Sequence, residues 1–202
     1  MNQQYELEVW QQDELVVGID EAGRGPLAGP VVVCGVILPK HYSHPVIFDS
    51  KKLSIKKRNA CFQDILNDAI WIGIEIVDEQ TIDQFNIYRA TQMAMERLAE
   101  RCQVKHVLTD AMPLISRGLS VTSLIKGDQL SISIAAASIV AKVLRDAKMT
   151  ALDKVYPAYG FAKHKGYGTK EHMLAIEQHG PLPIHRKSFE PIRSLCAFKL
   201  DI

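Results

Sequence analysis

The chain has 202 residues, of which 47% are hydrophobic and 23% charged, a balance typical of a globular protein with a buried core. No segment is long and apolar enough to span a membrane, and the first residues lack the basic start and apolar run of a signal peptide. The four cysteines are not closely paired, which argues against a disulfide framework or a cysteine zinc site. We expect one cytoplasmic domain over residues 1–202, monomeric and without a membrane partner.

Charge is distributed unevenly along the chain. Residues 1–141 carry 13 Lys and Arg against 17 Asp and Glu, a net charge of −4, whereas residues 142–202 carry 11 against 6, a net charge of +5. A basic last third beside a more acidic remainder favours a polyanion-gripping part next to a carboxylate-rich site. The alternative is an uneven but functionless distribution over a solvated surface.

Strands and helices alternate along the first part of the chain. Two apolar runs, Leu15–Asp20 and Val31–Leu38, flank a segment rich in glycine and proline, which predicts strand, irregular loop and strand. Ser54 is a suitable cap for a helix whose apolar residues recur at helical spacing as far as Ala69. Ile70–Val77 follows directly and predicts a third strand.

The remaining elements continue this alternation and end in helices. Further predicted helices run from the N-cap Asn86 to about Cys102, from about Ser133 to Val155 and from Thr169 to Gln178. Further predicted strands are His106–Thr109 and Val121–Ile125. This order predicts an α/β fold, with a central mixed β-sheet flanked by helices and a helical C-terminal part.

Acidic residues stand at three of the predicted strand ends. They are Asp20 with Glu21, Asp110, and Asp128. Carboxylates beside apolar runs need a basic partner or a metal ion, and the carboxyl ends of strands are where α/β proteins build sites. Oxygen donors without His or Cys suit Mg²⁺ or Mn²⁺, and two such ions are the usual device for hydrolysis of a phosphodiester. Taken singly, each acid is better explained as a cap or turn residue, and it is their coincidence at three strand ends that makes a metal site an equal alternative.

One geometric condition applies to Asp20 and Glu21. Neighbouring residues of a regular strand point to opposite faces, so both cannot ligate one site from an unbroken strand. We therefore expect the strand to end or bulge at these two residues.

The glycine-rich segment after Glu21 resembles a dinucleotide-binding loop only superficially. Gly23, Gly25 and Gly29 come close to the G-x-G-x-x-G pattern, but the spacing is one residue too long. Pro26 and Pro30 also prevent the loop from opening a helix whose amides would bind phosphate. We expect the loop to bring backbone close to a ligand instead, with Arg24 offering charge to a phosphate.

Six ordered motifs span most of the chain, and together they resemble the ribonuclease HII family. They are GIDEAGRGPLAGPV from Gly18, DSKKLS from Asp49, TDAM from Thr109, KGD from Lys126, AAASIVAKVLRD from Ala135 and HKGYGT from His164. The resemblance implies a ribonuclease H-like fold. It implies an endoribonuclease that cuts the RNA strand of RNA/DNA hybrids and nicks duplex DNA 5′ to single embedded ribonucleotides, leaving 3′-OH and 5′-phosphate ends.

The resemblance also implies roles for particular residues. Asp20, Glu21, Asp110 and Asp128 would be the catalytic ligands of two Mn²⁺ or Mg²⁺ ions. The backbone of Gly23, Arg24 and Gly25 would press against the ribose 2′-hydroxyl, and Tyr167 would sense the RNA-to-DNA junction. Lys51 would reach the scissile region, and Ser138 and Lys142 would lie near the substrate backbone. The 2′-hydroxyl is the atom by which a protein tells RNA from DNA at a given sugar.

Basic residues of the last third are candidates for phosphate contacts. Lys142, Arg145 and Lys148 recur every three residues on the long predicted helix. Lys163, Lys165 and Lys170 surround Tyr167 in sequence. Such contacts position a duplex without reading its sequence, which suits a structure-specific nuclease. We therefore expect residues from about 142 to 202 to form the part that binds the substrate backbone. A solvated helix face is the alternative for the first group.

Four histidines, His164, His172, His179 and His185, follow in the same region, at spacings that match no standard zinc pattern. We interpret them as surface or substrate-side residues.

Two rival functions stay open on these patterns. A nucleotide-binding regulator would use the glycine loop, and a non-catalytic nucleic-acid binder would use only the basic region. The acidic residues at three strand ends argue against both functions.

Overall fold

In the computed structural model, residues 3–47, 53–115 and 117–197 are described, and their strands form a five-stranded mixed sheet in the order β3-β2-β1-β4-β5. The strands are β1 (Val16–Ala22), β2 (Val31–Ile37), β3 (Trp71–Val77), β4 (His106–Asp110) and β5 (Ser120–Leu124). Strand β1 is antiparallel to β2 and parallel to β4, β2 is antiparallel to β3, and β4 is parallel to β5. The predicted mixed sheet is thereby confirmed.

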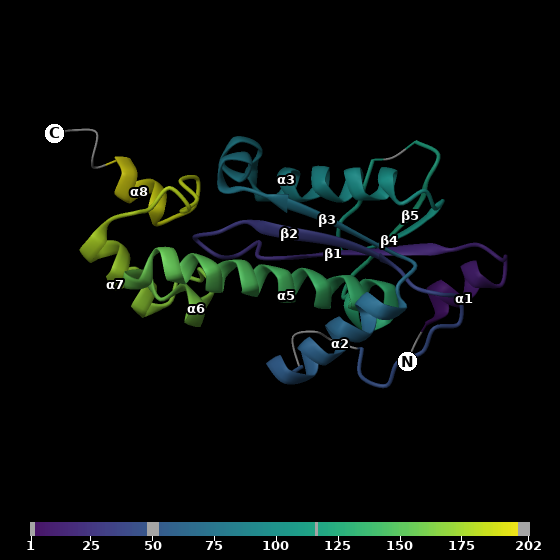
Figure 1. The fold of residues 1–202 in the computed structure, drawn as a ribbon. Coiled ribbons are helices and arrows are strands. Elements are labelled where there is room, and N and C mark those ends of the chain that lie inside the picture. The colour runs from purple at the N-terminus through teal and green to yellow at the C-terminus, as the bar shows by residue number, and fades with distance from the viewer. Residues whose placement is uncertain (1–2, 48–52, 116, 198–202) are drawn as a thin grey trace.

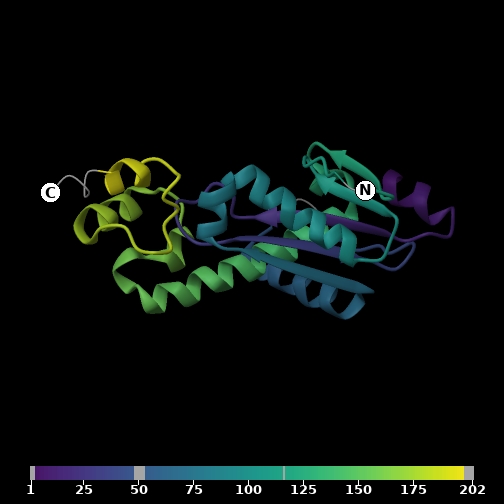
Figure 2. The same ribbon diagram turned by 90° about the horizontal axis from the view of Figure 1, so that it is seen from above.

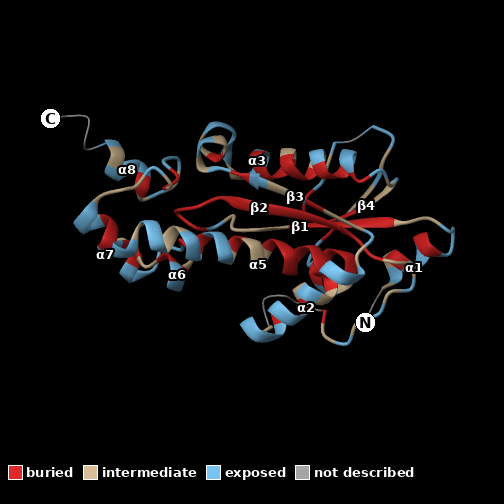
Figure 3. Ribbon diagram, viewed as in Figure 1, coloured by how far each residue is buried: buried red, intermediate tan, exposed pale blue. Residues whose placement is uncertain are grey.

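Helices cover both faces of this sheet (Figures 1 and 2). The helices are α1 (Gln4–Trp10), α2 (Ile55–Asp68), α3 (Glu79–Arg101), α4 (Gly127–Leu130), α5 (Ile132–Val155), the 3₁₀ turn η1 (Pro157–Tyr159), α6 (Phe161–His164), α7 (Lys170–His179) and α8 (Ile192–Ala197). One core cluster joins α5 and α2 to one face of β2, and another joins α3 to the opposite faces of β1 and β2. Every residue of β2 is buried, as expected of a strand packed on both sides (Figure 3).

Helix α5 lies directly against β1 because both elements offer small residues at the contact. A Cβ on Gly18 would come within 2.1 Å of the Ser133 carbonyl carbon, and Ala135, Ala136 and Ala137 are fully buried. The alanine-rich start of α5 is therefore a packing surface.

The helix cap predicted at Ser54 is confirmed, and one helix start is corrected. Ser54 accepts a hydrogen bond from the backbone of the first turn of α2, and Thr169, where a helix was predicted to start, does the same for α7. Helix α3 begins at Glu79 with Asp78 as its cap, eight residues before the predicted cap Asn86. Asn86 stands at a kink with φ 61°, where its side chain accepts from Arg89 N at 3.0 Å. Asn86 therefore caps the second of the two helical segments that make up α3.

The C-terminal helices sit at one end of the molecule, next to the loop that joins β1 to β2 (Figures 1 and 2). Phe161, Ile176 and Ile192 form a core there with Leu27 and Ala28 of that loop. The predicted helical C-terminal part is thus present, and it packs on the glycine loop. No helix in the described part of the chain has the length and apolar character to cross a membrane.

Candidate active site

Asp20 and Asp110 meet at the carboxyl ends of two parallel strands. Strands β1 and β4 pair in register from Val16 with His106 to Ile19 with Thr109, so the two aspartates follow the last pair on adjacent strands. Each chain segment delivers its acid at the point where the ladder stops. This is the edge of an α/β sheet at which ligands bind.

Asp128 reaches the same edge from the short helix α4. Lys126 adopts a left-handed conformation with φ 59°, which turns the chain from β5 into this helix. Gly127 then packs against Asp110: its N–H donates to Asp110 Oδ1 at 2.8 Å, and a Cβ on Gly127 would lie 3.4 Å from the Asp110 Cα. Asp128 follows at once and is only 2% exposed.

Glu21 departs from the expected geometry. Strand β1 neither ends nor bulges at Asp20 and Glu21, because both residues stay paired with β2, opposite Cys34 and Val33. The prediction of a break was wrong: the pairing of β1 with β4 stops at Ile19 and Thr109, but its pairing with β2 continues through Ala22. The two carboxylates therefore leave opposite faces of β1, and Glu21 lies 3.5 Å from the Arg24 guanidinium.

The site has a strongly unfavourable concentration of negative charge around Asp20. Burial, followed by the charges of Glu21 and Asp110, raises the Asp20 pKa well above its ordinary value. Hydrogen bonds from the Ser138 hydroxyl and from the Glu21 N–H, the latter 2.7 Å from Asp20 Oδ1, oppose this rise. An added cation at this edge would relieve the repulsion.

The donor chemistry at this edge fits a hard divalent ion. In the residues that the structure describes, no three Asp, Glu, His or Cys side chains already converge as a ligand cluster. Mg²⁺ usually takes only one or two protein carboxylates and completes its shell with water and substrate phosphates. The donor set of Asp20, Asp110 and Asp128 is compatible with that mode of binding.

The loop over residues 23–30 lies beside this edge and contains no helix, in agreement with rejection of a dinucleotide site. Two buried arginines hold its backbone. Arg145 of α5 donates to Pro30 O at 3.0 Å and to Ala28 O at 3.3 Å. Arg186 donates to Gly23 O, Arg24 O and Gly29 O over 2.6–3.1 Å.

Arg145 therefore corrects the expected basic stripe on α5. It is fully buried, whereas Lys142 is partly exposed and Lys148 is exposed. Its guanidinium points behind the glycine loop, so a surface grip on phosphate is incompatible with its place. Arg186 was missed altogether, because nothing in its sequence neighbourhood marks a cation that binds carbonyls far away in the chain.

Tyr167 lies across from the glycine loop. A Cβ on Gly25 would be 3.6 Å from the Tyr167 ring, and the ring is 46% exposed. Leu27 N also donates to Gly166 O at 2.8 Å, which ties the two loops together. The structure thus brings Gly25 and Tyr167, predicted as partners in substrate reading, into contact range of each other.

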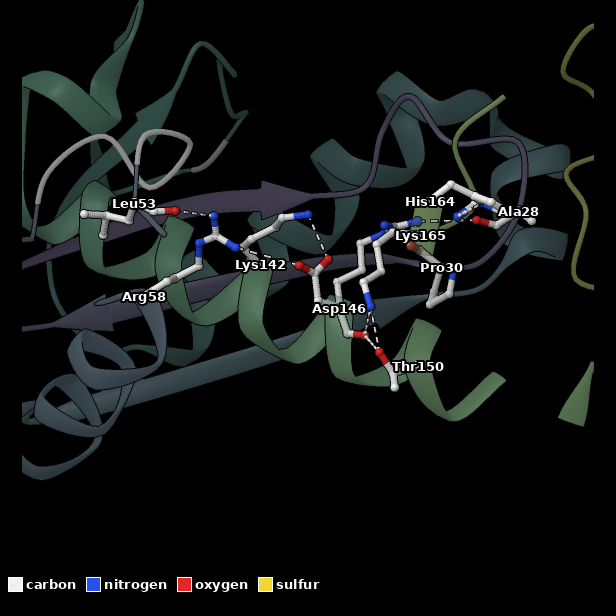
Figure 4. A network of polar contacts seen from close by, with 11 residues as sticks. Ala28, Pro30, Leu53, Arg58, Lys142, Asp146, Thr150, His164 and Lys165 are labelled. Atoms are coloured by element: carbon white, nitrogen blue, oxygen red, sulfur yellow. Dashed lines mark hydrogen bonds and ion pairs between the residues drawn. The ribbon is translucent and has the colours of Figure 1, made fainter. Parts of the chain in front are cut away.

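The other expected substrate contacts take part in a polar network on the outer side of α5 (Figure 4). Lys142 Nζ donates to Asp146 at 2.8 Å, and Lys165 Nζ donates to Thr150 Oγ1 at 2.7 Å. Arg58 of α2 lies 3.8 Å from the same Asp146. Both lysines are half-buried, and Lys165 lines a pocket of about 240 Å³ between α2 and α5. Lys51 lies outside the described residues.

The histidines also require a correction. His164, His172 and His185 are buried, and only His179 is exposed, so three of the four are not surface residues. The ring of His172 stacks on His164 at 4.5 Å, and its Nε2 lies 3.1 Å from His185 Nε2. They form a core beneath the Tyr167 loop.

Comparison with known proteins agrees with this arrangement of strand-end acids and glycine loop. The family model "Ribonuclease HII" matches residues 17–192. The chain belongs to the ribonuclease HII family. It is 51% identical to ribonuclease HII of Lacticaseibacillus paracasei over 191 residues, which cover 94% of this chain and 75% of that protein. Membership makes the protein a metal-dependent endoribonuclease, a hydrolase of the ribonuclease H class, and both rival functions are set aside.

Solved structures show the same fold. The ribonuclease H2 of Pyrococcus horikoshii OT3 matches with a TM-score of 0.75 at 22% identity, over 93% of this chain and 100% of that one. Bst-RNase HIII, solved in complex with Mn²⁺, matches with a TM-score of 0.66 at 16% identity, over 92% of this chain and 70% of that one. At these identities the likeness concerns the fold alone, and it confirms the ribonuclease H-like architecture.

Proposed function

We propose that this ribonuclease HII hydrolyses the RNA strand of RNA/DNA hybrids and nicks duplex DNA on the 5′ side of single embedded ribonucleotides, leaving 3′-OH and 5′-phosphate ends. The observation that carries the proposal is the adjacency of Asp20 and Asp110 at the ends of β1 and β4, with Gly127 bonding Asp110 and so bringing Asp128 beside them. A carboxylate-rich edge beside a 2′-hydroxyl-reading loop is the combination that such a reaction requires.

Asp20, Glu21, Asp110 and Asp128 would hold two divalent ions, Mn²⁺ or Mg²⁺, one of which a ribonuclease HIII of the same fold binds. Bound ions supply charge neutralisation and an activated water at the phosphodiester. The protein's own part is to orient these carboxylates: Gly127 N fixes Asp110, and Ser138 with Glu21 N fixes Asp20. The Glu21 side chain leaves the other face of β1. To bind an ion with the other three acids, it would have to reach around the edge of β1, which is no longer paired with β4 beyond Ile19.

Recognition of the ribose would depend on the glycine loop and Tyr167. Gly23, Arg24 and Gly25 offer backbone that a 2′-hydroxyl can approach, because Gly25 has no side chain in the gap toward Tyr167. The exposed Tyr167 ring is free to stack on the sugar or base at the junction with DNA.

The basic residues outside the core would grip the duplex. Lys142, Lys148 and Lys165 remain candidates for phosphate contacts, as does Lys51 on sequence grounds. We assign this grip to the part from about residue 142 to 202 of a single catalytic domain over residues 1–202. A cytoplasmic monomer that acts in removal of ribonucleotides from DNA, in repair and replication, is the setting that fits this chemistry.

A labelled duplex with one ribonucleotide tests the proposal. Incubation with Mg²⁺ or Mn²⁺ should give a single cut 5′ to the ribonucleotide, and an all-DNA duplex of the same sequence should stay intact. The Asp20→Asn variant should lose cleavage while it still binds the duplex. Cleavage at deoxyribonucleotides, or full turnover by Asp20→Asn, would contradict the proposal.

A further inference from the structure

The dipeptide His185–Arg186 lies between the two halves of the ribose-reading site. Its backbone runs beside the glycine loop: Ala28 and His185 form a β-bridge, and Arg186 N donates to Leu27 O at 2.9 Å. From this position the two side chains point in different directions. The Arg186 side chain contacts the glycine loop, and the His185 side chain points toward the Tyr167 loop.

Arg186 fixes the glycine-loop half. Its guanidinium is fully buried and donates to Gly23 O at 2.6 Å, Arg24 O at 2.8 Å and Gly29 O at 2.8 Å. One planar group thus bridges both ends of the loop, and it also stacks over the Phe189 ring at 5.1 Å. A lysine has no fork with which to bind these carbonyls together.

His185 fixes the Tyr167 half through a second histidine. Leu182 N donates to His185 Nδ1 at 2.8 Å, so the His185 proton sits on Nε2. That proton faces His172 Nε2 at 3.1 Å, which leaves the His172 proton on Nδ1, 3.0 Å from the Tyr167 carbonyl. The chain of bonds is complete only when both rings are neutral. Burial lowers the pKa of each to about 4, so both are neutral at physiological pH.

We propose that His185–Arg186 is the positioning and specificity-determining element of this enzyme, which sets the gap between Gly25 and Tyr167 in which the ribose 2′-hydroxyl is read. The proposal rests on the proposed function. Neither side chain touches the substrate; each holds the backbone of a group that does. A shift of either backbone by about 1 Å would lose the aligned contact.

Two pairs of substitutions separate positioning from support of the fold. His185→Asn keeps an acceptor for Leu182 N but removes the donor to His172, whereas His185→Gln can retain that donor. Arg186→Lys keeps the charge but not the fork. His179→Asn and Arg193→Lys are matched controls, because both residues are exposed and lie outside the two networks.

The decisive measurement is the ratio of affinities for a one-ribonucleotide duplex and an all-DNA duplex, taken in EDTA so that no strand is cut. In the parent and both controls the ratio should be about five- to tenfold, the worth of one hydrogen bond. His185→Asn and Arg186→Lys should bring it within about twofold of unity, and His185→Gln should restore part of it. With Mn²⁺ present, kcat should fall by about 10- to 100-fold.

The alternatives give different results. A merely structural role would lower both affinities, or the active fraction, and leave the ratio at the parent value; that outcome overturns the inference and spares the proposed function. A parent ratio near unity would overturn the reading of the 2′-hydroxyl, and this inference with it. Circular dichroism and an unfolding curve for each variant show whether the measured ratio belongs to folded protein.

Discussion

Two regions of this molecule contain buried charged side chains, and the surroundings of these charges differ: like charges in one region, backbone carbonyls in the other. The acid edge, made of Asp20, Glu21, Asp110 and Asp128, places like charges close to one another, and the charges of Glu21 and Asp110 add to the cost of burial at Asp20. The arginine clamp, made of Arg145 and Arg186, instead directs its guanidinium groups at backbone carbonyls of the glycine loop. Burial lowers the pKa of both arginines, to about 9 for Arg186.

The difference separates function from folding. Carboxylates that repel one another are stabilised by cations from outside the chain, so under the proposed function the acid edge would depend on divalent ions for its activity. Guanidinium groups bound to carbonyls need no ion from solution, so the clamp holds the glycine loop without added cations. Substitutions at the acid edge should therefore change turnover without changing the fold, and substitutions in the clamp should change both.

The largest effect is expected for Asp110→Asn. The asparagine keeps Oδ1 as the acceptor for Gly127 N, so the local structure of α4 should survive while one negative charge is lost. We expect cleavage of a one-ribonucleotide duplex to fall by at least about 100-fold in single-turnover measurements.

Stability provides the control for this variant. The unfolding midpoint of Asp110→Asn in EDTA should equal or exceed that of the parent, since a repulsive contact with Asp20 is removed. A large loss of stability would mean that the acid edge supports the fold, and the separation between the two regions would break down.

Arg145→Met should produce the next largest effect, and Lys148→Met on the same helix is its matched control. Loss of the buried guanidinium leaves the Pro30 and Ala28 carbonyls without their donor, which should cost about 2–4 kcal/mol in the free energy of unfolding. Lys148 is exposed, and its substitution should change that free energy by less than about 0.5 kcal/mol.

Urea denaturation measures both values. Salt dependence then sharpens the contrast: if Lys148 contacts phosphate, its loss should reduce the slope of log affinity against log salt by about 1, whereas Arg145→Met should not change that slope. Equal stability losses in the two variants would contradict the burial of Arg145.

The acid edge was accessible to sequence analysis because its signals are local. Asp20 and Asp110 each follow an apolar run that predicts a strand, and parallel strands bring their carboxyl ends together. What escaped at this edge was the continuation of β1 through Glu21, since it depends on a partner strand ten or more residues later. Local patterns fixed the place of the acids but not the direction of every side chain.

The arginine clamp was not accessible in this way. Arg145 bonds a carbonyl 115 residues away in sequence, and Arg186 bonds one 157 residues away. Helical spacing made Arg145 part of a basic stripe, because a cation on a helix is usually solvated. Its burial follows from a tertiary contact with an irregular loop, for which the sequence carries no periodic signal. The same applies to the buried rings of His172 and His185.

A pH dependence of stability should follow from those two rings. Their pKa values are about 4 in the folded protein against 6.5 ordinarily, so the unfolded chain binds more protons between these values. The stabilisation is complete above pH 6.5 and is lost as pH falls through 4. We expect a loss on the order of 2 kcal/mol in the free energy of unfolding over this interval.

Urea denaturation of the parent and His185→Gln at pH 7, 5.5 and 4.5 would show this loss, and the difference between the two proteins should shrink as the pH falls. The exposed His179 serves as the control, and His179→Asn should reproduce the parent curve. A stability difference between parent and His185→Gln that is constant with pH would mean that folding does not lower the His185 pKa, which would contradict the neutral pair that the hydrogen bonds to Tyr167 require.

The smallest effect on stability is expected for Gly25→Ala, and Gly23→Ala provides the contrast within the same loop. A Cβ at residue 25 would make ordinary contact with the Tyr167 ring at 3.6 Å, so the free energy of unfolding should change by less than about 0.5 kcal/mol. At residue 23, with φ 101°, a Cβ would lie 1.9 Å from Arg145 Nε, which forces the clamp apart and should destabilise the protein by more than about 1 kcal/mol.

Cleavage should nevertheless fall in both variants. The displaced clamp would shift the loop in Gly23→Ala, and the added methyl of Gly25→Ala would occupy the space that the ribose would enter. A fully active Gly25→Ala enzyme would place ribose recognition outside the gap between Gly25 and Tyr167, whereas a stable but inactive one would locate recognition there.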